Sequence, residues 1–547
     1  MPRLKVWACI TLFAVRAAYA DTLYVAPGFD IADAIAAADS GDVILLEPGT
    51  FGGPVLPYGK DLTIASRYLL DGDTAWIRQT IVSAPDGDSS STVIAAYGET
   101  ALNLVGFTLQ GGSGTYDERN EISGGGGMYV HAANVNVQAC RFDGGRAPLG
   151  GGVFVSGSAW EWNAHVRIRD SEFNGCNADY WGGGIYADFC SLTVAKSLLV
   201  NLTCDMAAAG IHSGTSQIAM DSVVVAGCFG GEGGIGLYEG WGRIYACEFV
   251  GNGTPSTGFC NDISANNFWG EITRCVFRNT DGLWPSVHIG GRYGSTRFVG
   301  NVLENNSTSM ATGTLIVNDP NNTEVSHNIF RNNTNVEGGA VYAFGRATAR
   351  VEYNTFVGNS SLNPSKGAVL QSVTFGSPRF SQNIIAGNEG VAVTFFPDYP
   401  VVLDVRYNWW GHASGPYHEG LNPNGQGDTL FGDSVLFSPW LTTPPDTSML
   451  FVVDPREVPI AGTWDLQRVF PNPFNNAFTV SVSGFADEKF ELALHNILGQ
   501  KVMTLHRGSA TGGMFTFSVS PDIASGVYFL VAHDGQIRES IKVVLLK

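Results

Sequence analysis

A repeat of about 26 residues constrains this chain more than any other feature. Residues 327–333 read HNIFRNN and residues 353–359 read YNTFVGN. One apolar position recurs at steps of 25 to 31 residues: Phe142, Phe173, Leu199, Val224, Phe249, Phe277, Leu303, Phe330, Phe356, Ile385 and Trp410. A period of this length predicts a structural repeat in which each unit packs against the next.

A second apolar column lies five residues before the first. Its members are Val137, Ile168, Val194, Ala219, Ile244, Ile272, Phe298, Val325, Val351, Phe380 and Val405. Both columns are expected to face a common interior. Side chains alternate faces along a strand, so the residues just before this column point outward. They run Arg243, Glu271, Arg297, Glu324, Arg350, Arg379 and Asp404. We interpret them as solvated pairs between neighbouring units, each contributing about 0–1 kcal/mol, rather than as a binding stripe.

Two further columns are polar. Two residues before the first column stand Cys140, Ser171, Ser197, Ser222, Cys247, Cys275, Asn301, Asn328, Asn354, Asn383 and Asn408. Three residues after it stand Asn252, Asn306, Asn333, Asn359 and Asn388. Buried amides need hydrogen-bond partners, and stacked amides supply them to one another. The sequence therefore predicts asparagine ladders at the corners of the repeat.

A glycine-led strand also recurs, as GGGMYV, GGGVFV, GGGIYA, AAGIHS, GGAVYA and GAVLQS. Repeats of this length hold two or three short strands but no crossover helix, which predicts a solenoid of parallel strands. The 69 glycines and only 15% charged residues favour a turn-rich β protein. Over residues 22–441 the chain resembles the right-handed parallel β-helix of pectate-lyase-like proteins. About a dozen coils spaced ~4.8 Å apart would make a rod of about 60 Å.

Both ends of the solenoid are predicted to be capped. FDIADAIAAADSG places Ile31, Ala34, Ile35 and Ala38 on one face of a short helix that Gly41 can end. At the other end, residues 407–441 break the period with glycine, proline and aromatic residues. Caps of this kind prevent edge-to-edge aggregation.

The composition shifts after residues 442–447, TTPPDT, and we assign 442–465 to a linker and 466–547 to a small antiparallel β-sandwich. Asp534-Gly535 is a hairpin signal. The segment contains four motifs: Pro471-Asn472-Pro473, Asn496 to Gln500 including Gly499, Ser525 to Tyr528 including Gly526, and a basic end with Lys542 and Lys547. Through these motifs it resembles the C-terminal sorting domain of the type IX secretion system. This resemblance implies handling by an outer-membrane secretion machinery, followed by release or attachment at the bacterial cell surface.

Residues 1–20 have a basic start, a short apolar run and an Ala-Tyr-Ala exit, which predicts a cleavable export signal. We expect a mature chain from Asp21 without a transmembrane segment. Loss of Arg3, Lys5 and Arg16 would change the formal net charge from −19 to −22. Such an acidic surface repels phosphate backbones, so nucleic acid is not an expected partner.

Eight cysteines follow the predicted signal, at positions 140, 176, 190, 204, 228, 247, 260 and 275. In an exported chain an even number favours disulfides. Stacked cysteines in one column, such as Cys247 and Cys275, have poor disulfide geometry and equally suit small buried side chains. The sequence leaves both alternatives open.

Catalytic residues are harder to find. RNTDG at 278–282 resembles the Asn-Thr-Asp motif of polygalacturonases, which makes Asp281 a candidate acid, but the further motifs of that family do not follow. The segment DERNE offers Asp117 and Glu118 as candidates for a pectate-lyase-type acid cluster, and a solvated loop explains it as well. His165, Arg167 and Arg169 share an outward face that suits a uronate carboxylate.

Aromatic residues in and beside the loops suggest sugar binding. The candidates are Trp160, Trp162, Trp181, Trp241, Trp269 and Trp284, with Tyr180 beside them. Exposed indoles stack on pyranose rings, although they also shield glycine-rich strands. We expect no cofactor. Calcium fits residues 71–74 or 422–428, but neither has a full ligand run, and both are typical of turns.

Two classes of function remain. The first is a secreted or cell-surface rod that binds a polysaccharide or surface glycan, or adheres, without catalysis. The second is a secreted polysaccharide lyase or glycoside hydrolase with a divergent site. The regular charge columns and the missing catalytic set favour the first, and the tryptophans suit both. Fold alone does not decide between them.

Overall fold

The structure is a computed structural model in which the chain forms two compact units that divide near residue 450. It describes residues 21–447 except 85–89, 118–120, 159–161, 254–259, 310–312, 319–322, 337, 346–347, 375–377, 396–401 and 433. In the second unit it describes residues 464–470, 474–475, 477–486, 490–496, 500–508, 510–519, 523–533 and 538–546.

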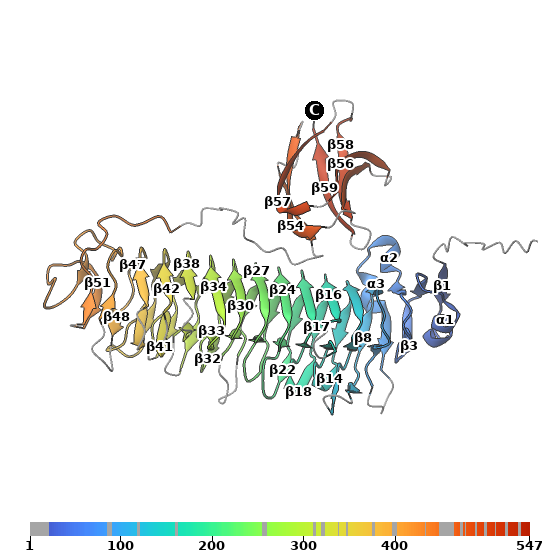
Figure 1. Ribbon diagram of the computed structural model, residues 1–547, viewed down its shortest axis with the longest axis horizontal. Helices are drawn as coiled ribbons and strands as arrows, with labels where there is room; N and C mark the ends of the chain where they lie inside the picture. Colours follow the sequence, from blue (N-terminus) through green and yellow to red (C-terminus); the bar gives the residue numbers. More distant parts are fainter. Residues whose placement is uncertain are drawn as a thin grey trace, which may run out of the picture. The chain divides into compact units, whose positions relative to one another are not determined.

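The first unit is a solenoid of three long parallel sheets, A, B and C, and the chain visits them in that order once per coil (Figure 1). Sheet A holds β1 (Thr22–Val25), β2 (Val43–Leu46), β4 (Thr63–Ser66), β7 (Leu102–Val105), β12 (Asn134–Gln138), β16 (His165–Arg169), β20 (Ser191–Ala195), β24 (Gln217–Asp221), β27 (Trp241–Tyr245), β30 (Trp269–Thr273), β34 (Ser295–Val299), β38 (Glu324–Ser326), β42 (Arg350–Glu352) and β46 (Arg379–Ser381). Sheet B holds β3 (Gly49–Gly52), β5 (Thr80–Ser83), β8 (Thr108–Gln110), β13 (Arg141–Asp143), β17 (Glu172–Asn174), β21 (Leu198–Val200), β25 (Val224–Ala226), β28 (Glu248–Val250), β31 (Val276–Arg278), β35 (Val302–Glu304), β39 (Ile329–Arg331), β43 (Thr355–Val357) and β47 (Ile384–Ala386).

Sheet C holds β6 (Val93–Ala95), β11 (Met128–His131), β15 (Val153–Ser156), β19 (Ile185–Asp188), β23 (Ile211–Ser213), β26 (Ile235–Tyr238), β29 (Ile263–Asn266), β33 (Val287–Gly290), β37 (Leu315–Val317), β41 (Val341–Gly345), β45 (Leu370–Thr374), β48 (Val391–Phe395), β51 (Gly427–Phe431) and β50 (Pro416–Tyr417). The short strands between sheets B and C are β9 (Thr115–Asp117), β10 (Ile122–Gly124), β14 (Arg146–Leu149), β18 (Asn177–Trp181), β22 (Thr203–Cys204), β32 (Asp281–Gly282), β36 (Ser307–Thr308), β40 (Thr334–Asn335) and β44 (Ser360–Ser361). Near the end of the solenoid, β49 (Leu403–Asp404) pairs with β52 (Val435–Leu436). The predicted solenoid of parallel strands is confirmed.

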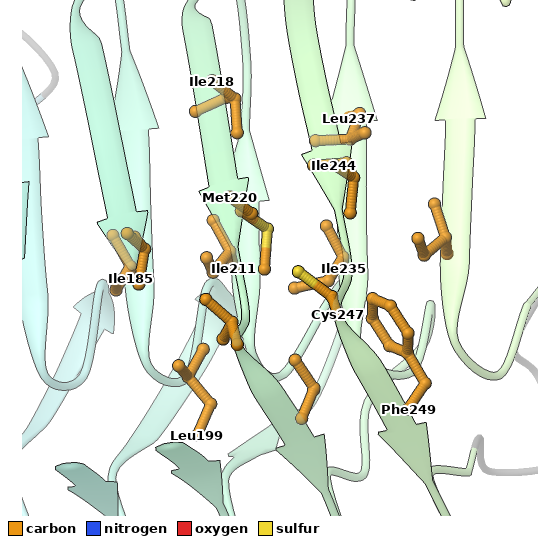
Figure 2. Packing of buried hydrophobic residues seen from close by; sticks show 14 of the residues in the cluster. Ile185, Leu199, Ile211, Ile218, Met220, Ile235, Leu237, Ile244, Cys247 and Phe249 are labelled. Carbon is orange, nitrogen blue, oxygen red and sulfur yellow. The ribbon is translucent and has the colours of Figure 1, made fainter. Parts of the chain in front are cut away.

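The two apolar columns fill the interior, as predicted, and stack coil on coil (Figure 2). Stacked rings such as Phe142 and Phe173, with centroids 4.4 Å apart, continue the column along the axis. One coil corrects the sequence alignment: Leu199 pairs with Val225, not Val224, and Val194 pairs with Met220, not Ala219.

The predicted asparagine ladders are also confirmed. In the ladder between sheets A and B, each amide oxygen accepts hydrogen bonds from the backbone and side-chain amides of the preceding member, at 2.8–3.1 Å. It runs through Asn301, Asn328, Asn354, Asn383 and Asn408.

The second ladder, between sheets B and C, runs from Asn306 to Asn388 and ends on the Asp428 carboxylate, which accepts from the Asn388 side chain at 2.8 Å. Ser222, predicted in the first ladder, is instead an exposed corner residue with φ 55°, and Val223 takes the buried position. Equivalent corners at Lys196 and His327 are left-handed too. One left-handed residue per corner turns the chain between sheets.

All eight cysteines are free and buried. This supports the interpretation as small core side chains and not as disulfides. Burial raises the pKa of the Cys140 thiol to about 12, as it does for Cys176 and Cys190. A protonated buried thiol is a poor nucleophile, so these residues act as packing groups.

A helix covers the first coil, as predicted. It is α1 (Ile31–Ala37), with Ile31 and Ile35 buried and the Asp30 carboxylate accepting from the Ala32 amide. The helix ends before Gly41, because Ala38 already has an extended backbone. The Lys60 ammonium donates hydrogen bonds to the Ile35 and Ala38 carbonyl oxygens at 2.7 Å. Two shorter helices, α2 (Tyr68–Asp71) and α3 (Ala75–Gln79), follow β4. At the far end, Trp410 is fully buried.

The second unit consists of two antiparallel sheets with their own apolar core. One holds β53 (Trp464–Phe470), β54 (Ala477–Ala486) and β57 (Ala510–Ser518), and the other β56 (Lys501–Arg507), β55 (Glu491–Asn496), β58 (Gly526–His533) and β59 (Arg538–Leu545). Asn496 and Gln500 bond to each other across the β55–β56 turn at 2.9–3.0 Å. Antiparallel β58 and β59 flank the predicted Asp534-Gly535 hairpin, whose turn lies outside the described residues.

Candidate functional site

Two tryptophans lie side by side on the outer face of sheet A. Trp241 begins β27, Trp269 begins β30, and the two residues are register partners. Their exposed fractions are 42% and 43%. Each is followed by a glycine, and a Cβ on Gly242 would lie 1.8 Å from the Ile218 carbonyl oxygen. This close packing of the backbone holds the two indoles on a fixed surface.

Trp162 joins this pair from the turn that precedes β16. Its ring centroid lies 4.5 Å from that of Trp241, and Phe189 meets its edge at 6.4 Å. Three of the six predicted tryptophans thus form one surface, which we call the sheet A aromatic surface: Trp162, Trp241 and Trp269. Its rings offer apolar faces of the kind on which pyranoses pack.

The next outward row of sheet A carries charge in alternation. Arg243 contacts Glu271 at 3.3 Å, and Arg297 lies between Glu271 at 3.4 Å and Glu324 at 3.1 Å. The predicted ion pairs between coils are therefore present. Because Arg243 and Arg297 are bound by carboxylates, this part of the row presents balanced charge beside the aromatic surface.

A second aromatic surface covers the outer face of sheet C. Tyr129, Phe154, Tyr186 and His212 occupy one outward row on β11, β15, β19 and β23, and their rings stack at 5.1–5.9 Å. Trp181, 41% exposed at the end of β18, stacks on both Tyr186 and His212. Most of this row is covered by the short strands between sheets B and C.

Next to His212 the row opens, because its partner on β26 is Gly236. The Glu232 carboxylate occupies this space: a Cβ on Gly236 would lie 2.9 Å from its Oε2. Glu232 Oε1 accepts a hydrogen bond from the Tyr238 hydroxyl, and Oε2 lies 3.9 Å from His212 Nδ1. Burial raises the pKa of Glu232 to about 7 and lowers the pKa of His212 to about 4. We call this group the Glu232 cluster.

A second buried carboxyl lies inside the coil. Asp262 accepts hydrogen bonds from Asn252 Nδ2 at 2.9 Å and Thr280 Oγ1 at 3.0 Å. Burial raises its pKa to about 7, against the hydrogen bonds from Asn252 and Thr280. Asp262 thereby links Asn252 and Thr280 at a position where the second ladder has no amide.

Of the predicted catalytic residues, only Asp281 has a side chain within the described part of the structure. Asp281 is exposed on β32 and accepts a hydrogen bond from the Ser307 hydroxyl. Its neighbours Asn279 and Thr280 occupy the ordinary corner, with a left-handed Asn279 and a Thr280 amide bonded to Asn306. Asp117 ends β9, but its side chain lies outside the described residues, as do Glu118 and Trp160.

The remaining predicted binding residues that the structure describes lie in one turn and on β16. Trp284 lies in the turn between β32 and β33, where its carbonyl accepts a hydrogen bond from Asn261 Nδ2. His165 is exposed at the start of β16, and Arg169 is paired with Asp170 at 3.1 Å.

Sequence reasoning missed the Glu232 cluster. Tyr186 and His212 stand at the second-last position of the quoted strands GGGIYA and AAGIHS, where Tyr129 and Phe154 also stand. That outward column was visible in the sequence. Glu232, in contrast, reaches the row from a turn four residues before Gly236, and no periodic position marks it.

Among the described residues, no group of three or more His, Cys, Asp and Glu side chains is placed to hold a metal ion. In residues 71–74, the Asp71 and Asp73 carboxylates accept from backbone amides of the helical turns around them. In residues 422–428, Asp428 closes the second ladder. The Asp71, Asp73 and Asp428 carboxylates therefore all accept hydrogen bonds from within the chain.

Taken together, the three long parallel sheets and the internal ladders make the first unit a right-handed parallel β-helix. Residues 468–546 match the family described as the secretion system C-terminal sorting domain. The chain is therefore a bacterial protein exported to the cell surface or beyond through a type IX sorting domain. Pro471, Asn472, Pro473 and Gly499 lie outside the described residues, and Gly526 begins β58. No helix in the described part of the chain is long and apolar enough to cross a membrane.

No curated protein matches the chain. Among solved structures it is similar to a tailspike protein gp49 from Acinetobacter baumannii bacteriophage Fri1, a capsular polysaccharide depolymerase. The identity is 11% and the TM-score 0.22, over 92% of this chain and 77% of that chain. A likeness of this degree carries no information on function.

Proposed function

We propose that this protein is a secreted or surface-attached β-helix rod that binds polysaccharide without cleaving it. The observation that carries the proposal is the pair of half-exposed indoles, Trp241 and Trp269, in register on adjacent coils with Trp162 against them. Exposed aromatic faces at coil spacing suit stacking on successive sugar rings. We propose residues 1–20 as export signal, 21–441 as rod, 442–465 as linker and 466–547 as sorting domain.

Replacing both indoles should strongly weaken binding without unfolding the rod. We expect Trp241→Ala/Trp269→Ala to reduce affinity for the bound polysaccharide about 100-fold, taking about 1.4 kcal/mol per lost stacking contact. The measurement is affinity electrophoresis of the full-length protein in gels containing neutral glucan, mannan, xylan, alginate or polygalacturonate. The matched control is Trp76→Ala, a partly exposed indole on α3 that donates a hydrogen bond to Asp71 and lies outside sheet A. Wild-type protein that migrates unretarded in every gel contradicts the proposal.

A second candidate, a polysaccharide lyase or glycoside hydrolase, is favoured by the Glu232 cluster beneath Trp181. Between about pH 4 and 7, Glu232 would be protonated and His212 neutral, given their pKa values. A proton donor next to a proton acceptor is what acid–base cleavage of a glycosidic bond requires.

If the protein cleaves polysaccharide, Glu232→Gln should reduce the rate at least 100-fold, because the amide cannot supply the proton. The measurement is release of reducing ends and of unsaturated-uronate absorbance across pH 4–8, with and without calcium. Asp281→Asn serves as the control at the exposed corner. Activity that survives Glu232→Gln, or is lost in Asp281→Asn, would exclude this cluster as the cleavage site.

A further inference from the structure

The two tryptophans belong to a longer row that follows the axis of the rod. The first residues of six successive strands of sheet A are register partners: His165, Ser191, Gln217, Trp241, Trp269 and Ser295. We call this set the axial row. All six are exposed or partly exposed. Each points outward because side chains alternate along a strand and the residue that follows lies on the inward face.

The spacing of the row matches a polymer of sugars. Adjacent parallel strands lie about 4.8 Å apart, which is close to the length of one pyranose residue along its chain. A polysaccharide that lies parallel to the rod axis therefore meets the same position of each coil with each successive sugar. A chain that crosses the axis meets one member of the row and then leaves it.

The chemistry of the row is uncharged. Two members are indoles, and three are hydroxyl or amide side chains that exchange hydrogen bonds with sugar hydroxyls. Burial and Arg167 lower the pKa of His165, so it is neutral at pH 7. The neighbouring Arg243 and Arg297 are already paired with Glu271, and the chain as a whole carries a net charge of −19. The two described arginines that flank the indoles are thus already bound by carboxylates, and the net charge of the chain gives an anionic polymer an unfavourable field.

We propose that the axial row binds an uncharged polysaccharide whose chain runs along the rod, one sugar per coil, with its rings stacked on Trp241 and Trp269 and its hydroxyls bonded to Gln217, Ser191 and Ser295. The inference rests on the proposed glycan-binding function and adds the class of glycan, its direction and its extent. It also distinguishes this surface from Trp181 of β18, which stacks on the outer face of sheet C on a different side of the coil.

The test uses the full-length protein and oligosaccharides of two to eight sugars, prepared from the uncharged polysaccharide that retards it, with oligogalacturonates as the charged series. Affinity, measured by titration calorimetry, should rise with length up to about five or six sugars and then level off. Gln217→Ala should weaken binding of the hexasaccharide three- to fivefold and leave the disaccharide unchanged, because two sugars occupy only the indoles. Trp241→Ala should weaken both about tenfold.

Other results overturn the inference in distinct ways. Affinity that levels off at two sugars, with Trp241→Ala still harmful, keeps the aromatic site but refutes the axial direction. Preference for oligogalacturonates refutes the uncharged class. Loss of binding in Trp181→Ala but not in Trp241→Ala moves the site to sheet C. If no polysaccharide binds, the proposed function itself fails together with this inference.

Discussion

Replacing Asn328 by alanine is expected to destabilise the rod by about 3–6 kcal/mol. The amide oxygen of Asn328 accepts hydrogen bonds from the Asn301 backbone and side chain at 2.8 and 3.0 Å, and its own side-chain amide donates to Phe298 O and Asn354 Oδ1 at 2.9 Å. Alanine removes one hydrogen bond from each of these buried groups, although Asn354 Oδ1 still accepts from the Asn328 backbone amide and Asn301 Nδ2 still donates to Ile272 O. The cost is about 1–3 kcal/mol for each donor or acceptor that stays unsatisfied. The cavity adds to that cost.

Urea denaturation of the full-length protein, followed by intrinsic fluorescence, measures the effect. Because each coil contacts only its neighbours, Asn328→Ala should also broaden or split the transition of the rod. The matched control is Asn332→Gly, an exposed asparagine four residues later whose left-handed φ of 54° glycine accepts without strain. We expect it to change stability by less than about 1 kcal/mol. Equal effects of the two substitutions would show that the ladder has no special role.

The repeat made most of the rod predictable because every coil requires the same residue type at the same position. The columns could be recognised in the sequence because stacked coils place the same residue type at the same position. Examples are phenylalanine at 330 and 356, asparagine at 328 and 354, and the charged residues just before the second apolar column. The misplacement at Val224 has a simple cause. Val223, Val224 and Val225 are equally apolar, so the sequence shows no alternation there, and only strand pairing with Leu199 decides which one points inward.

The candidate sites were only partly predictable for the opposite reason. Trp241 and Trp269 could be identified because they lie outside the apolar columns of the repeat. The repeated Trp-Gly pair marks their positions in adjacent coils. The Glu232 cluster depends on Trp181 and Glu232, which come from segments outside the repeat, and on the missing side chain at Gly236. No periodic signal reports how such segments fold back over a sheet.

Asp262→Asn is expected to make stability less dependent on pH and to raise it above neutral pH. Burial raises the pKa of Asp262 from 3.8 to about 7 in the folded protein. A carboxyl with a raised folded pKa takes up a proton on folding, so its contribution is complete below pH 3.8 and is lost as the pH rises through about 7. The difference corresponds to at most about 4 kcal/mol between these limits, at 1.36 kcal/mol for each pKa unit.

Asparagine has the shape of the protonated acid and carries no charge at any pH. Its amide can still accept from Asn252 and can donate toward Thr280 Oγ1, so the link between those two residues survives the substitution. Thermal melts at intervals from pH 4 to pH 9 should therefore give similar midpoints for the two proteins at pH 4 and a widening advantage for Asp262→Asn above pH 6. Asp281→Asn, at an exposed carboxylate, should follow the wild type throughout. A parallel decline in Asp262→Asn and the wild type would mean that another buried carboxyl, with Glu232 the first to test, governs the loss of stability at high pH.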